Sequence, residues 1–158
     1  MTLERDSLSQ EAADLAIRHA LGLVTVEEVI AWANRLIPSL YPANIEIIDL
    51  PLAANDPAGI HRRLNELGKG ADRRLSLKKA LLELHDRVAK GRVDLRSALN
   101  TLLDSYRREI HGIPGSVHAI VESAHIQYDL FDAGLTRRNI AGIEAEILDE
   151  LLKLTQHL

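Results

Sequence analysis

The sequence predicts an all-α protein, a compact bundle of about seven helices with one extended segment near residues 45–50. Two observations lead to this fold class. The 158 residues are 46% hydrophobic but only 3% aromatic, and Leu, Ala and Ile supply most of the apolar side chains. That composition favours helix-on-helix packing over a β-sandwich, which needs more Val, Thr, Tyr and Phe. Apolar residues also recur at helical spacing along most of the chain.

The first helix is expected over residues 9–21, because Gly22 can take the left-handed conformation that ends a helix. The second helix begins with a capping box, the clearest local signal in the chain. In such a box the Thr25 hydroxyl accepts a hydrogen bond from the amide of Glu28, and the Glu28 carboxylate accepts one from the amide of Thr25. Apolar residues at helical spacing follow, and Pro38 marks the expected end.

Three prolines interrupt the helical pattern after the second helix: Pro42, Pro51 and Pro57. Between them, residues 45–50 form a short apolar stretch that we interpret as β-like or extended. Because an isolated strand cannot satisfy its own backbone, this stretch is either an ordered loop over the helices or an edge that pairs with another chain. Asp56 then caps a short helix that has Pro57 at its first position and ends near residue 67.

We expect a single helical domain over residues 1–158, with one candidate flexible point at residues 68–70, Gly-Lys-Gly. Four further amphipathic helices follow. The first of them is expected from Ser76 to Gly91, the second from Asp94 to Ile110, and the third from Ser116 to Gly134. Thr136 is the expected cap of the last helix. The last helix carries two apolar faces, which indicates either a central place in the bundle or a subunit interface.

Four polar residues form a stripe along the helix that begins near Ser116: His118, Glu122, His125 and Asp129. At about 100° per residue, they fall within roughly 60° of one another. Two imidazoles and two carboxylates in one line are a candidate metal site, and Glu122 with His125 has the Glu-x-x-His spacing of di-metal bundles once. The same stripe is also what a solvent-facing edge between two apolar strips looks like, and both interpretations stay open.

The remaining candidate chemistry is sparse. His19 is in line with apolar residues and is expected to be a partly buried packing residue, whereas His61, beside two arginines, is expected in a surface patch. The chain has no G-x-S-x-G or H-E-x-x-H motif and no cysteine, which excludes a cysteine nucleophile and thiolate metal sites. These features favour a protein that is not an enzyme.

Charge and hydropathy limit the partners. The formal net charge is −4 at pH 7, whereas nucleic-acid binders usually carry a basic excess, so we expect no nucleic-acid partner. No apolar run approaches the length of a membrane span, and residues 1–10 lack the apolar stretch of a signal peptide. We therefore expect a soluble cytoplasmic protein with no membrane partner, and the lack of cysteine fits a reducing compartment.

One segment resembles a known group of proteins. Residues 21–33 read Leu-Gly-Leu-Val-Thr-Val-Glu-Glu-Val-Ile-Ala-Trp-Ala, and residues 45–52 follow them. The capping box and Trp32 carry the resemblance, which spans about residues 21–52. This stretch is similar to the opening of small helical bacterial proteins that serve as partners or immunity proteins of toxin systems. The resemblance implies a non-enzymatic protein that binds another protein, and it transfers no site residue.

Three functions follow from these observations. The leading hypothesis is a non-catalytic protein-interaction module, an immunity-type or regulatory partner protein. The second is a metal-dependent helical enzyme that uses His118, Glu122 and His125, with Asp129 as a further ligand or support. The third is a structural homodimer with contacts through the last helix and residues 45–50. No cofactor is expected other than that candidate metal.

Overall fold

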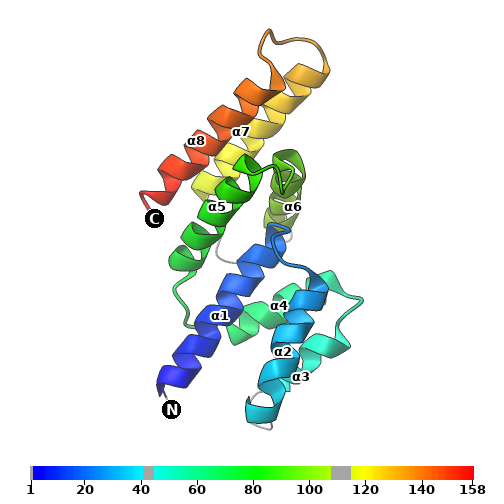
Figure 1. Cartoon of the computed structure of the whole chain (residues 1–158), viewed down its shortest axis with the longest axis vertical. Helices are drawn as coiled ribbons and strands as arrows, with labels where there is room; N and C mark the ends of the chain where they lie inside the picture. The colour runs from blue at the N-terminus through cyan, green and yellow to red at the C-terminus, as the bar shows by residue number, and fades with distance from the viewer. Residues whose placement is uncertain (1, 41–44, 108–114) are drawn as a thin grey trace. The chain divides into compact units, whose positions relative to one another are not determined.

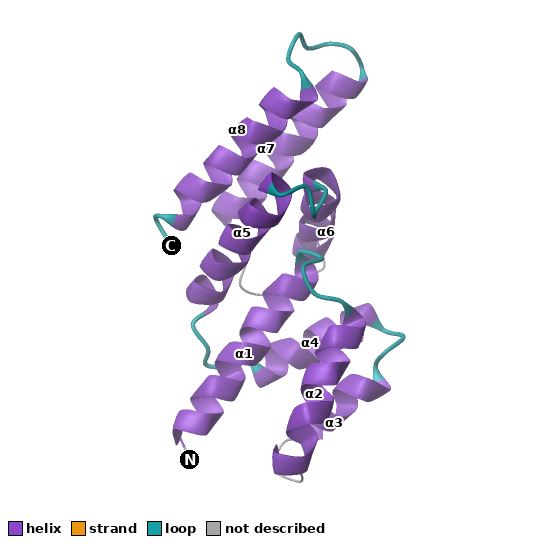
Figure 2. Ribbon diagram, in the orientation of Figure 1, coloured by secondary structure: helices purple, strands orange, loops and turns teal. Residues whose placement is uncertain are grey.

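The computed structural model describes residues 2–40, 45–107 and 115–158 (Figure 1). All regular structure within these ranges is helical, in eight helices with no strand (Figure 2), so the predicted all-α class is confirmed. The helices are α1 (Thr2–Ala20), α2 (Val26–Leu40), α3 (Ile45–Leu52), α4 (Pro57–Leu67), α5 (Arg73–Ala89), α6 (Leu95–Arg107), α7 (Gly115–Asp132) and α8 (Ile140–Thr155). None of the helices described combines the length and the apolar character that a membrane crossing requires.

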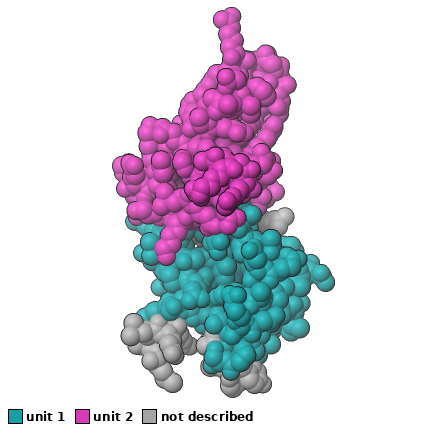
Figure 3. Space-filling view, viewed as in Figure 1, with its two compact units in different colours: residues 1–76 teal, residues 77–158 magenta. Residues whose placement is uncertain are grey.

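The chain divides into two compact units, residues 1–76 and 77–158, which Figure 3 colours separately. The first unit holds α1 to α4, the second holds α6 to α8, and α5 begins in the first and continues into the second. The expectation of one domain over residues 1–158 stays a prediction. The candidate flexible point at residues 68–70 is a hydrogen-bonded turn, in which the amide of Ala71 donates to the carbonyl of Gly68 at 3.1 Å.

In the first unit, α1 and α3 both pack against α4, and α2 packs against α3. Apolar side chains from all four helices form its core, including Ala12, Val29, Ile47, Leu50 and Leu64. Trp32 is also buried there, and its indole Nε1 donates a hydrogen bond to Glu11 Oε2 at 2.9 Å, which satisfies the only polar atom of the ring.

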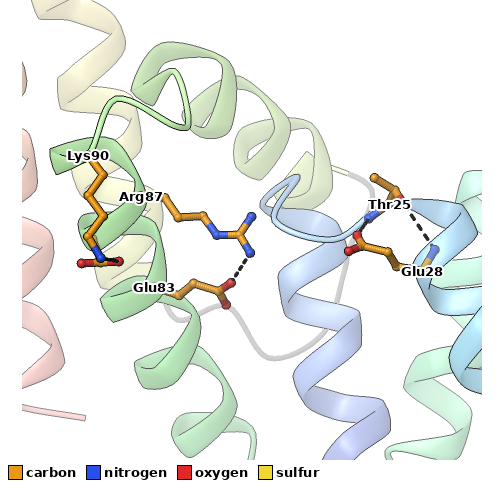
Figure 4. Close-up of polar contacts among 6 residues, drawn as sticks. Thr25, Glu28, Glu83, Arg87 and Lys90 are labelled. Atoms are coloured by element: carbon orange, nitrogen blue, oxygen red, sulfur yellow. Dashed lines mark hydrogen bonds and ion pairs between the residues drawn. The ribbon is translucent and has the colours of Figure 1, made fainter.

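The local start signals of α2 and α4 are confirmed. The amide of Glu28 donates to Thr25 Oγ1 at 3.2 Å and the amide of Thr25 donates to Glu28 Oε2 at 2.7 Å, so both halves of the capping box form (Figure 4). At α4, Asp56 Oδ1 accepts from the amide of Gly59 at 3.0 Å, and Pro57 occupies the first turn. Gly22 ends the turn after α1 with a φ of 70°.

The prediction of an extended segment at residues 45–50 is wrong, because these residues begin helix α3. Ile47 and Leu50 are three residues apart and both are fully buried, which a helix achieves by placing them on one face. Their burial between α2 and α4 outweighs the β preference of the isoleucines. Pro51 lies in the last turn, where it removes a single helical hydrogen bond.

The predicted start of the first helix and the predicted end of the second also need correction. α1 begins at Thr2 rather than near residue 9, because its apolar face already includes the buried Leu8. α2 continues past Pro38 to Leu40. Pro38 and Asn34, the residue four positions before it, are both exposed, so water can satisfy the carbonyl that the proline leaves without a donor.

In the second unit, α7 packs against both α6 and α8. Its buried apolar side chains come from α5 to α8 and include Leu84, Leu99, Val121, Tyr128 and Ile147. Two ion pairs four residues apart lie along α5 (Figure 4): the half-buried Glu83 with Arg87 at 2.6 Å and the exposed Asp86 with Lys90 at 2.8 Å.

The caps of the later helices follow the prediction in part. Asp94 caps α6, where its Oδ2 accepts from the amide of Ser97 at 3.0 Å. α8 is capped by Asn139, not by Thr136, because the Asn139 carboxamide oxygen accepts from the amide of Gly142 at 2.7 Å. α5 begins at Arg73 rather than at Ser76, which is buried and donates to Asp14 at 2.5 Å. The expected end of the sixth helix near Ile110 lies outside the described residues.

Candidate functional site

The polar stripe predicted from the sequence lies on α7, beside the buried face of that helix. The buried face consists of Val117, Val121, Ala124 and Tyr128. His118 and His125 are half-buried at its border, whereas Glu122 and Asp129 are exposed. The stripe therefore marks the boundary between the core and the surface, with imidazoles on the inner side and carboxylates on the outer side.

One contact joins two members of the stripe that lie four residues apart. His118 Nε2 lies 3.1 Å from Glu122 Oε1. His125 Nε2 is buried, and no hydrogen-bond partner for it is found among the described residues. His118 and His125 are seven residues apart, which separates them by about 10 Å along the helix axis. The two imidazoles therefore do not face one common point.

The metal hypothesis requires ligands that converge. In the described part of the chain, no group of three or more His, Asp or Glu side chains is arranged to hold a metal ion. A site at the stripe needs further ligands from neighbouring helices, since one helix presents at most two ligands to one ion at adjacent turns. The metal assignment of His118, Glu122, His125 and Asp129 stays a prediction.

A second polar cluster, which sequence reasoning missed, joins α6, α7 and α8. The Arg96 guanidinium lies 4.8 Å from the centre of the Tyr128 ring and donates to both carboxylate oxygens of Asp132, at 2.5 and 3.3 Å. The Tyr128 hydroxyl donates to Glu144 Oε1 at 3.2 Å. These contacts fix the three helices against one another through one buried ring.

The electrostatics of this cluster follow from the same contacts. Burial raises the pKa of Tyr128, and the neighbouring charge of Glu144 adds to that effect. The hydrogen bonds that Arg96 donates to Asp132 lower the pKa of Asp132 and raise the pKa of Arg96. Tyr128 therefore stays a neutral hydrogen-bond donor, and the cluster is suited to holding the fold rather than to moving protons. No local spacing rule pairs residues as distant in sequence as 96 and 132.

Two histidines meet in the first unit. The rings of His19 and His61 are stacked at 6.5 Å between centroids with an interplanar angle of 25°. The predicted surface position of His61 is wrong, because it is buried on the same face of α4 as Leu64. His19 is half-buried as expected, and burial lowers its pKa.

The surface of residues 115–158, which contain α7 and α8, is distinctive in charge. This segment has seven of the 23 carboxylates and three of the 19 Lys and Arg residues, which leaves 16 of each in residues 1–114. The net charge of −4 therefore resides in this segment alone, and α7 itself contains neither Lys nor Arg. The same segment has three of the six large apolar side chains that are exposed in the described part of the chain: Ile126, Phe131 and Leu135.

Comparisons with models of protein families, with curated proteins and with solved structures give no match. The described chain is an all-α protein with an acidic, partly apolar surface on α7 and α8.

Proposed function

We propose that this chain is a non-catalytic protein-interaction module, an immunity-type or regulatory partner of another protein in the bacterial cytoplasm. The observation that carries the proposal is the exposure of large apolar side chains on α7 and the turn after it. Ile126 is 59% exposed and Leu135 is 75% exposed. Apolar side chains that are exposed together mark sites of protein interaction, and Ile126, Phe131 and Leu135 lie within ten residues of one another in the sequence.

The chemistry of the chain supports the same proposal. The sequence offers no motif for a nucleophile or a zinc-dependent hydrolase, and the described residues bring no three metal-ligating side chains together. The polar clusters around Tyr128 and Trp32 are satisfied by internal partners, as expected for structural groups. The resemblance of residues 21–52 to immunity-type proteins points to the same class.

A homodimer is the second candidate, and one observation on α8 favours it. The second apolar face predicted for the last helix includes Ala141 and Ala145, which are exposed, and Leu148 and Leu152, which are half-buried. The chain itself therefore covers this face only in part. Light scattering of the purified protein at high concentration tests the dimer, which requires twice the mass of the chain.

The partner hypothesis is tested with the product of the neighbouring reading frame in the genome. The two full-length proteins are expressed together, purified through a tag on one of them, and titrated against each other by calorimetry. We expect a stoichiometric complex. Failure to form a complex would contradict the proposal, and metal-dependent turnover of a metabolite by the isolated chain would favour the enzyme.

A further inference from the structure

We propose that the outer face of α7, formed by Glu122, Ile126 and Asp129, binds a cationic protein segment that presents Lys or Arg side chains around an apolar side chain. This inference rests on the proposed function and adds to it the surface and the chemistry of the partner. The three residues are spaced by four and three positions, so they lie next to one another on consecutive turns.

The shape of the face comes from the burial pattern of α7. The core side of the helix is defined by Val117, Val121 and Tyr128, which are buried. Ile126 projects from the other side, and Glu122 and Asp129 are exposed on either side of it along the helix. An apolar side chain between two carboxylates offers both an anchor and a ring of charge, which is the usual composition of a binding site with an apolar centre and a polar rim.

The charge of the face selects the partner. α7 supplies no Lys or Arg to balance its carboxylates, and Arg96 from α6 hydrogen-bonds Asp132 and acts on Asp129 only through its charge. Glu122 contacts His118, whose imidazole carries a charge only when it is protonated. The segment of residues 115–158 has an excess of four negative charges, so its field attracts a basic partner and disfavours nucleic acids and acidic proteins.

The same charges argue against a second copy of this chain as the occupant. A two-fold symmetric contact brings the same patch of each copy together. Two copies joined through this face would place the carboxylates of Glu122 and Asp129 opposite an equally acidic surface, which costs free energy. A basic partner meets no such repulsion.

The probe for this test is a short, fluorescently labelled helical peptide of Leu and Lys, whose binding to the full-length chain is measured by fluorescence anisotropy. The matched peptide of Leu and Glu serves as the charge control. Two variants change the face, Ile126→Ser and the double variant Glu122→Gln with Asp129→Asn. Two matched controls change exposed residues of the first unit, Leu52→Ser and the double variant Asp6→Asn with Glu27→Gln.

We expect the Lys peptide to bind the wild type more tightly at low salt than at high salt. Its dissociation constant should rise about tenfold for Ile126→Ser and about fivefold for the carboxylate variant, while the control variants keep the wild-type value. Equal weakening in the controls, no weakening in the α7 variants, or equal binding of the Glu peptide would overturn the assignment. A dimer in light scattering that Ile126→Ser dissociates would overturn it as well, in favour of a second copy.

These outcomes are separable from the proposed function. If the wild-type chain forms a complex with the product of the neighbouring reading frame and Ile126→Ser leaves that affinity unchanged, the surface assignment is wrong and the interaction function stands. If no complex forms and the α7 variants also leave peptide binding unchanged, both are wrong.

Discussion

At the residue scale, Tyr128 shows how one buried side chain can hold three helices. Its ring lies in the core under the Arg96 guanidinium, and its hydroxyl reaches Glu144 on α8. The hydroxyl contributes less to stability than the apolar area of the ring does. Water can take the place of the hydroxyl as hydrogen-bond donor to Glu144, because Glu144 is only half-buried. The ring therefore dominates the stabilisation.

Two substitutions separate these contributions. Tyr128→Phe keeps the ring and removes one hydrogen bond, so we expect the free energy of unfolding to fall by about 1 kcal/mol. Tyr128→Ala removes the ring and leaves a cavity, so we expect a loss of about 3–5 kcal/mol. Urea denaturation followed by circular dichroism measures both values. Equal losses would mean that the hydroxyl, not the ring, carries the effect.

The stacked histidines of the first unit lead to a prediction about pH. Burial lowers the pKa of His19 in the folded state below its ordinary value of 6.5, so the unfolded chain takes up the proton first as the pH falls. The contribution of His19 to stability is therefore complete above about pH 6.5 and is lost as the pH falls below it. We expect His19→Gln to flatten the decline in melting temperature over this range.

The control for that experiment is His157→Gln, at an exposed position near the C-terminus. It should leave the pH dependence of the melting temperature as in the wild type. If His19→Gln and His157→Gln give the same curve, burial of His19 does not set the acid sensitivity.

At the scale of single helices, local signals in the sequence decide where several of them begin. The capping box of Thr25 and Glu28, Asp56 followed by Pro57, and Asp94 all act through hydrogen bonds within three residues, and all three form as predicted. A hydrogen bond between residues within one helical turn can be predicted without knowledge of the tertiary structure.

The capping box gives a quantitative test. Thr25→Ala removes the acceptor for the amide of Glu28, so we expect a loss of about 1 kcal/mol in the free energy of unfolding. The matched control is Thr101→Ala within α6, where the hydroxyl only bonds the carbonyl of Ser97 in its own helix. Alanine is a better helix former than threonine, so the control should be neutral or slightly stabilising in chemical denaturation. A larger loss at Thr101 than at Thr25 would contradict the capping role.

The sequence predicts an extended segment at residues 45–50, where the structure has helix α3. A pair of substitutions distinguishes these two conformations. In the helix Leu50 is fully buried and Leu52 is 80% exposed, whereas a strand would place both on the same side. We therefore expect Leu50→Ala to cost about 2–5 kcal/mol and Leu52→Ala less than about 0.5 kcal/mol. Similar costs for the two variants in urea denaturation would support the extended conformation instead.

At the scale of the whole molecule, the sequence predicts the all-α class and the stripe on α7, because periodicity and composition report directly on helical faces. It does not predict the helical state of residues 45–52 or the burial of His61, because neighbouring helices decide both. The pairing of Arg96 with Asp132 is likewise invisible, since it joins different helices. Local sequence patterns predict secondary structure, whereas contacts between residues distant in sequence form only in the folded chain.

The metal hypothesis also belongs to this scale, since it concerns what the purified protein contains. We expect metal analysis by mass spectrometry to give far less than one equivalent per chain, for the wild type and for His125→Ala alike, because the described ligands do not converge. Stoichiometric metal in the wild type that His125→Ala removes would support the metal-dependent enzyme over the interaction module.

Hydrogen–deuterium exchange tests whether this chain binds another protein through α7. The full-length chain is compared alone and in the presence of the product of the neighbouring reading frame. We expect slower exchange in the complex within Gly115–Asp132, with little change in residues 1–76. Unchanged exchange throughout, or protection confined to residues 1–76, would contradict it.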